Sequence, residues 1–165
     1  MQYASVQDLM DRFGERELIQ LTDQDELQAV KTPRAQRALD DAQAFVDGFV
    51  GRIYSLPLMG CKQPAPVPGD PHAVRYVPPP QLMRICCDVA RYYLHTHLSP
   101  EHEVYLRFKA AERELQAIAD GKTLLSCPWG GAPGQQLAGD APGQAEVYSS
   151  FSRRSVSDVD LRGFA

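Results

Sequence analysis

The chain has 165 residues, of which 44% are hydrophobic and 23% charged, as in an ordinary soluble domain with a buried core. Its formal net charge of -4 argues against tight binding to a nucleic acid backbone, which needs a concentration of lysine and arginine. There is no apolar run of about 18 residues and no basic stretch followed by an apolar one at the N-terminus, so we expect neither a membrane span nor a secretion signal.

The cysteines are Cys61, Cys86, Cys87 and Cys127, in none of the spacings that are typical of a disulfide framework. Because no export signal is recognised, we expect all of them to be reduced thiols in a cytoplasm. Cys86 falls on the apolar stripe of a predicted helix, which favours a small core residue over a reactive one.

Two short helices are predicted near the N-terminus. Segment 5–13 begins with Ser5, and Asp8 follows three residues later, which is the spacing of a capping box. Gly14 is expected to end this helix, because glycine readily adopts the backbone conformation that helix termini need. The segment "ERELIQLT" at 15–22 predicts a second short helix with three apolar residues.

The strongest helical pattern covers residues 33–53. Thr32 is expected to cap this helix, and Pro33 stands in its first turn, where the missing N–H costs nothing. Apolar residues recur at steps of three and four from Ala35 to Ile53, opposite a charged face. The pattern predicts an amphipathic helix about 30 Å long.

The next segment, 56–80, is too rich in proline for a regular helix, so we expect an extended loop or loose hairpin, with room for a short strand at 72–77. Two more helices are predicted at 81–98 and 100–120, the second capped by Ser99 and ended by Gly121. Adjacent Tyr92 and Tyr93 cannot both face one core, so one of them is expected to reach a polar partner or an interface.

These elements predict an all-α fold, a bundle of about three long helices and two short N-terminal ones with a proline-rich loop and an extended C-terminal arm. The expected domains are a helical domain at 1–125, a flexible linker rich in glycine and proline at 126–148, and a docking segment at 149–165.

The C-terminal segment "SSFSRRSVSDVDLRGFA" keeps large apolar and arginine residues after the linker, which favours a docking peptide for another protein. The alternative is that it packs back on its own domain. The candidate partner-binding residues are Phe151, Arg153, Arg154, Val156, Val159, Leu161, Arg162 and Phe164.

A second candidate contact is the segment "YSLPL" at 54–58. Tyr54, Leu56 and Leu58 are large apolar residues at the end of the predicted long helix, where they could meet a partner. The alternative is that Tyr54 and Leu56 only seal the helical bundle.

Several features suggest catalysis or a metal site, but each has a simpler interpretation. "DGKT" at 120–123 resembles the end of a phosphate-binding loop, yet it follows a helix and lacks the earlier glycine. Paired carboxylates such as Asp40 and Asp41 lie on a polar helix face. The possible zinc ligands Cys86, Cys87, His95, His97 and His102 are not grouped in the compact pairs of structural zinc sites. We therefore predict no catalytic residue, no metal ligand and no cofactor.

Four blocks, "YASVQDLMDRFGERELIQLTD" (3–23), "ALDDAQAFVDGFVGRIYSLPL" (38–58), "RICCDVARYYLH" (84–95) and "FSRRSVSDVDLRGF" (151–164), resemble the gene product 36 proteins of Mu-like phages. Loop 59–79 and the linker are longer than this resemblance would lead one to expect. The resemblance implies a structural protein of virion assembly, similar to the head–tail connectors of the phage neck, and not an enzyme.

The same resemblance implies the partners. They would be the portal, neighbouring neck or tail-completion proteins, and further copies of the chain in a ring that forms either alone or only on the portal. Contact with passing DNA would be weak and unspecific. The protein would lie in the virion neck, and in the host cytoplasm during assembly.

Two other hypotheses remain. The first is a small cytoplasmic adaptor or regulator that binds nucleic acid or a host protein through the helix at 100–120, where Arg107, Lys109 and Arg113 stand among four glutamates. The second is a thiol- or metal-dependent enzyme, which requires Cys86 or Cys87 to be exposed and reactive.

Overall fold

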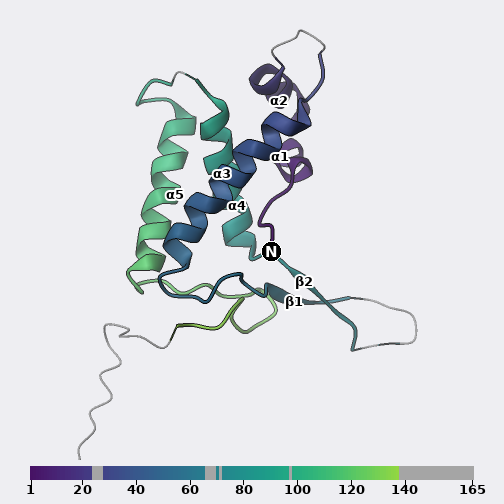
Figure 1. Cartoon of the computed structure of the whole chain (residues 1–165), viewed down its shortest axis with the longest axis vertical. Helices are drawn as coiled ribbons and strands as arrows, with labels where there is room; N and C mark the ends of the chain where they lie inside the picture. The colour runs from purple at the N-terminus through teal and green to yellow at the C-terminus, as the bar shows by residue number, and fades with distance from the viewer. Residues whose placement is uncertain (24–27, 66–69, 71, 97, 138–165) are drawn as a thin grey trace, which may run out of the picture.

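The computed structural model describes residues 1–23, 28–65, 70, 72–96 and 98–137. In this part of the chain, helices form an upright body, and a two-stranded hairpin projects from its lower end (Figure 1). In chain order the elements are α1 (Val6–Phe13), α2 (Glu15–Thr22), α3 (Thr32–Val50), β1 (Cys61–Pro64), β2 (Val74–Val77), α4 (Pro80–Leu94) and α5 (Glu103–Ala119).

Both short N-terminal helices are confirmed, and α1 begins with the predicted capping box. The Ser5 hydroxyl accepts a hydrogen bond from the Asp8 amide at 3.3 Å, and the Ser5 amide donates to the Asp8 carboxylate at 2.7 Å. Gly14, with φ of 89°, ends α1 and leads directly into α2.

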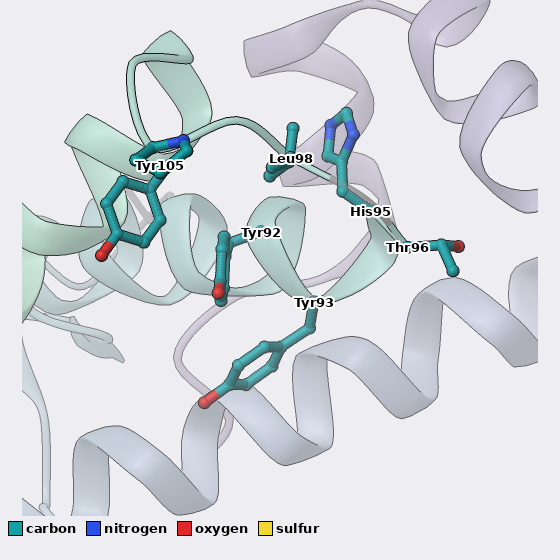
Figure 2. Close-up of a pocket in the computed structure, with 7 residues that line it drawn as sticks. Tyr92, Tyr93, His95, Thr96, Leu98 and Tyr105 are labelled. Carbon is teal, nitrogen blue, oxygen red and sulfur yellow. The ribbon is translucent and has the colours of Figure 1, made fainter.

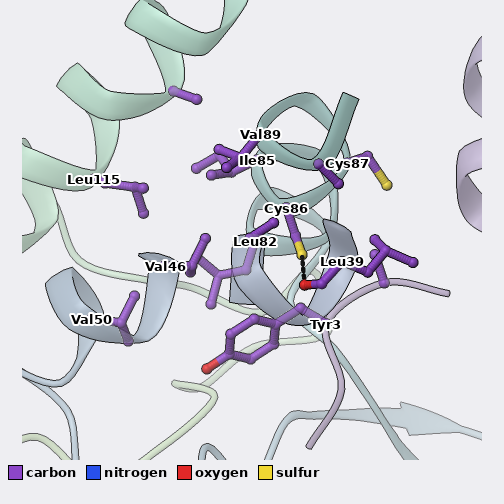
Figure 3. Packing of buried hydrophobic residues seen from close by; sticks show 14 of the residues in the cluster. Tyr3, Leu39, Val46, Val50, Leu82, Ile85, Cys86, Cys87, Val89 and Leu115 are labelled. Atoms are coloured by element: carbon purple, nitrogen blue, oxygen red, sulfur yellow. Dashed lines mark hydrogen bonds between the residues drawn. The ribbon is translucent and has the colours of Figure 1, made fainter. Parts of the chain in front are cut away.

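The core lies where α3, α4 and α5 pack against one another, and Figure 3 shows the apolar side chains that meet there. Burying each large apolar side chain contributes about 1.5–3 kcal/mol, so this contact dominates the stability of the body. No helix in the described part of the chain is long and apolar enough to cross a membrane. The core side chains labelled in Figure 3 include Leu39, Val46, Val50, Leu82, Ile85, Val89 and Leu115.

The long helices differ from their predicted boundaries at the ends. α3 starts at Thr32 without a side-chain cap, so the prediction that Thr32 caps it is wrong. α5 starts at Glu103 instead of 100, because the imidazole of His102 accepts a hydrogen bond from the Val104 amide at 3.2 Å and acts as the cap. Gly121, with φ of 70°, follows the end of α5 as predicted.

The prediction of an all-α fold is wrong, because the proline-rich segment forms a β-hairpin and the fold is mixed α/β. β1 and β2 pair antiparallel, with Cys61 opposite Val77 and Pro64 opposite Val74. The β2 sequence "VRYV" has the β-branched and aromatic residues that favour strands. Prolines exclude a helix here, but they allow an extended backbone to find a partner strand.

Below the helices, two segments distant in sequence run side by side, and we call residues 53–61 and 122–137 together the base layer (Figure 1). The amides of Ser55 and Gly60 donate to the carbonyls of Gln135 and Pro133, both at 2.9 Å. The amide of Leu137 donates to the Ile53 carbonyl at 2.8 Å. Residues 126–137 of the predicted linker therefore lie in the base layer, and residues 138–148 lie outside the described part of the chain.

A disulfide joins Cys61 to Cys127, with their Cα atoms 5.4 Å apart. The prediction that all the cysteines are reduced thiols is thus wrong for these two. Spacing along the chain could not reveal the pair, because the fold brings together residues that are 66 positions apart. The disulfide ties the base of the hairpin to the base layer.

Candidate protein-interaction surfaces

Tyr54 connects the base layer to the helical body. Its side chain is fully buried, and its hydroxyl accepts a hydrogen bond from the Leu125 amide at 2.8 Å. The turn that ends α3 places Tyr54 there, since its amide donates to the Val50 carbonyl at 2.9 Å. A single side chain therefore fixes both segments of the base layer under the bundle.

The three residues predicted as contacts in segment 54–58 fall in different environments. Tyr54 and Leu58 are buried within the chain itself, with 0% and 3% of their surface exposed. Leu56 is 38% exposed and remains open to a partner. The position of Tyr54 agrees with the alternative, in which this residue seals the helical bundle. A contact of Leu56 with a partner stays a prediction.

All the predicted contact residues of the C-terminal segment lie outside the described residues. They are Phe151, Arg153, Arg154, Val156, Val159, Leu161, Arg162 and Phe164. Their role as a docking peptide therefore stays a prediction.

Seven exposed large apolar side chains of the described residues lie on the base layer and the hairpin, and of these only Leu56 was predicted from the sequence as a contact. Trp129 is 45% exposed and Met59 is 64% exposed. Their residue types are those of a protein core, so the sequence alone does not show that these side chains are exposed. A surface with many exposed apolar side chains is typical of a site that contacts another protein. The other exposed members of this group are Leu56, Leu124 and Leu137 in the base layer and Val74 and Tyr76 in the hairpin.

The two faces of the hairpin differ in character. Side chains alternate between the faces of a strand, so Lys62, Pro64, Val74 and Tyr76 share one face of this ribbon. Val74 and Tyr76 are 52% and 45% exposed on that face. On the opposite face, the Arg75 guanidinium donates to the Gln63 amide oxygen at 2.7 Å.

A surface cavity of about 490 Å³ opens at the other end of the body, beside the end of α4 (Figure 2). Tyr92, Tyr93 and Tyr105 line it together with His95. Tyr92 stacks on Phe108 with ring centroids 4.2 Å apart, while Tyr93 is 38% exposed. The two adjacent tyrosines thus have different environments, and contact of either with a polar partner or an interface stays a prediction.

Asp88 is a buried carboxylate between α4 and α5. One of its oxygens lies 3.6 Å from the Arg84 guanidinium, and the other lies 4.0 Å from that of Arg107. Burial raises the pKa of Asp88 above its ordinary value of 3.8, although the arginines around it act in the opposite direction. The free-energy cost of burying the negative charge therefore exceeds the favourable interaction of that charge with the arginines.

We expect Asp88→Asn to raise the free energy of unfolding at pH 7 by on the order of 1 kcal/mol. The folded state holds the proton of Asp88 more tightly than the unfolded chain does. The free energy of unfolding of the natural protein therefore falls as pH rises through the pKa of Asp88 in the folded state. Arg84 and Arg107 keep Glu114 and Glu103 as partners in this variant. Thermal unfolding between pH 3 and 7 tests it: the advantage of the variant should vanish at the acid end, and a lower melting temperature at pH 7 would refute the prediction.

Cys86 and Cys87 are buried thiols in α4, as predicted for Cys86. The Cys86 thiol lies 4.0 Å from the Leu39 carbonyl oxygen (Figure 3). Burial raises the pKa of Cys86 to about 12 and that of Cys87 to about 11. The enzyme hypothesis required one of these thiols to be exposed, and neither is.

Native labelling of Cys86 by iodoacetamide at pH 8 should be roughly a thousandfold slower than in the unfolded chain, because a rise of the pKa from 9.0 to about 12 removes the thiolate. Peptide mass spectrometry after timed labelling measures the rate, with urea-unfolded protein as the control. Equal rates in the two states would show an accessible thiol.

Among the described residues, no group of three or more histidine, cysteine or carboxylate side chains is placed to hold a metal ion. The "DGKT" segment directly follows α5, with Asp120 as the C-terminal cap, and the Lys122 ammonium pairs with the Asp120 carboxylate at 3.0 Å. The interpretation of this segment as a helix end is therefore confirmed.

Among the described residues, the fold defines a small α/β protein in which most of the exposed large apolar side chains lie on a hairpin and a base layer. Residues 3–140 match the sequence model of the family described as "Bacteriophage Mu, Gp36", and the chain belongs to this family. The family match ends before the segment 149–165, so the C-terminal part of the resemblance lies beyond it.

Two curated relatives agree with this assignment. "Gene product J" of Escherichia phage Mu is 33% identical over 128 residues, which cover 74% of this chain and 75% of the relative. "Mu-like prophage FluMu protein gp36" of Haemophilus influenzae is 27% identical over 123 residues, which cover 74% of each chain. The resemblance to phage proteins that the sequence analysis described is thereby confirmed.

Proposed function

We propose that this protein is a structural subunit of virion assembly, a head–tail connector that joins a ring under the portal of a tailed phage or prophage. Its partners are the portal and neighbouring neck or tail-completion proteins, together with further copies of itself. The protein lies in the virion neck after assembly and in the host cytoplasm before it. Its work is contact between proteins, with only weak and unspecific contact with passing DNA.

The observation that supports this proposal is the distribution of exposed apolar side chains on a member of a phage protein family. Exposed apolar side chains such as Met59, Trp129 and Tyr76 lie on the base layer and on a hairpin that stands clear of the helical body. A connector needs such a division, because a stiff body holds its place in a ring while projecting elements reach its neighbours.

The alternative of a regulator that binds nucleic acid through α5 is less well supported. Arg107 pairs with Glu103 at 2.7 Å, and Lys109 pairs with Glu112. Cations that are already paired with carboxylates on the same helix contribute little to binding a phosphate backbone. This leaves Arg113 as the exposed cation of α5 for which the described part of the chain provides no ion pair.

Co-sedimentation with the portal ring of the same phage tests the proposal. The full-length protein is compared with a version truncated after Tyr148, and with a full-length variant in which Phe151, Leu161 and Phe164 are changed to serine. The matched control changes Ser149 and Ser150 to alanine, which alters the same segment without removing an apolar anchor.

We expect the full-length protein and the alanine control to sediment with the portal. The other two versions should lose most of their binding, because the ring that forms on the portal needs the C-terminal segment. Binding by all versions keeps the connector and assigns the C-terminal segment to another contact. If no version binds, the connector proposal fails and the regulator becomes the better hypothesis. Salt-sensitive binding of duplex DNA at micromolar concentration or below would support the regulator.

A further inference from the structure

The two outer edges of the hairpin are unequal. The edge of β1 carries Pro64, which has no N–H to donate, and Lys62, a residue that commonly blocks pairing at strand edges. The outer edge of β2, "VRYV", carries neither, and no other described strand pairs with it. An edge of this kind is a template for one more strand.

The outer part of the hairpin is little covered by the described part of the chain. A two-stranded ribbon is marginally stable in water by itself, and a third strand is a common solution. The Cys61–Cys127 disulfide holds the base of the ribbon, but Val74 and Tyr76 near its other end remain about half exposed. A strand added beside β2 would cover these side chains on one face and pair with Arg75 on the other.

One segment of this sequence has the pattern that such a strand requires. In "DVDL", residues 158–161, apolar and acidic residues alternate with the period of a strand. Placed antiparallel to β2, these residues set Val159 opposite Tyr76 and Leu161 opposite Val74. The same register sets Asp160 opposite Arg75, so the charges complement each other as well.

We propose that residues 158–161 of a neighbouring copy add as an antiparallel third strand to the outer edge of β2. This inference rests on the proposed function, because it assigns the C-terminal segment of one subunit to the next subunit of a ring. The backbone hydrogen bonds of the added strand provide affinity, and the alternating side chains provide the register.

The arrangement of the chain favours a neighbouring copy over the same molecule. In Figure 1 the hairpin projects to the right of the base layer, whereas the yellow-green end of the described chain leaves it on the left. A second copy that lies beside the hairpin in the same orientation would have the end of its described chain, at Leu137, on the side that faces this hairpin. The 20 residues between Leu137 and Asp158 can span at most about 70 Å when fully extended. Contacts between two different surfaces of identical subunits close into rings when the rotation permits.

Photo-crosslinking from position 76 tests the contact directly. Tyr76 is replaced by benzoylphenylalanine, and equal amounts of ¹⁵N-labelled and unlabelled protein are mixed, irradiated and analysed by peptide mass spectrometry. The sample is measured alone and on the portal ring. We expect crosslinks from position 76 to residues 158–161 that join a labelled peptide to an unlabelled one.

A charge reversal tests the register. Arg75→Asp should lower the yield of this crosslink by about tenfold, since an attractive cross-strand pair becomes repulsive, and adding Asp160→Arg should restore it. Arg113→Asp, which reverses an exposed cation on α5, is the matched control and should leave the yield unchanged.

Crosslinks that form only within one molecule, or none to residues 158–161 in either sample, would overturn the inference. These outcomes are distinct from failure of the connector itself. Co-sedimentation with the portal without this crosslink would leave the connector in place and remove only the strand addition. The crosslink without co-sedimentation would keep the strand addition and remove the connector.

Discussion

Changing both Cys61 and Cys127 to serine should lower the free energy of unfolding by about 4 kcal/mol, the figure that chain entropy gives for a crosslink between residues 66 positions apart. The disulfide encloses α4 and α5, so its loss lets the unfolded chain explore many more conformations. It also removes the tie between β1 and the base layer, which leaves the hairpin base to hydrogen bonds alone.

Urea unfolding in the presence and absence of reductant measures this effect. The natural protein should lose about 4 kcal/mol when reduced, and the double serine variant should not respond to reductant at all. Cys87→Ala is the matched control, because that thiol takes no part in the disulfide and its removal should leave the response to reductant intact. A natural protein whose stability is the same with and without reductant would contradict the prediction.

Changing Tyr54 to alanine should lower the free energy of unfolding by about 3–5 kcal/mol, since it removes a fully buried aromatic ring. Tyr54→Phe separates the two roles of this residue. It keeps the ring but leaves the buried Leu125 amide without its partner at 2.8 Å, at a cost of about 1–3 kcal/mol.

Hydrogen exchange shows where the stability is lost. In Tyr54→Phe the amides of Leu125 and Ser55 should exchange faster, while those in the middle of α4 should keep their protection, because the base layer opens before the bundle unfolds. Leu56→Ala, at an exposed position two residues along the chain, serves as the control and should change stability by less than about 1 kcal/mol. Uniform loss of protection in Tyr54→Phe would show that base layer and bundle form one cooperative unit.

The candidate interaction surface could be predicted only in part, and particular residues show why. Leu56 and Leu58 are the same residue type two positions apart, yet one is exposed and the other is buried. Leu58 lies against Gly134 across the base layer, whereas Leu56 lies beside Gly51 at the end of α3. Periodicity reports which side of a helix is apolar, but in an irregular segment it gives no face to assign.

By itself, the sequence determined the features that depend on neighbours within a few positions. The Ser5 capping box, the glycine ends of α1 and α5, and the apolar stripes of α3, α4 and α5 are all local patterns, and family membership follows from residues in order along the chain. Only the tertiary structure decided the Cys61–Cys127 disulfide, the strand pairing and the base layer. Each of these joins segments that local patterns treat as separate, because the free energy that forms it is released only when the helical body brings distant residues together.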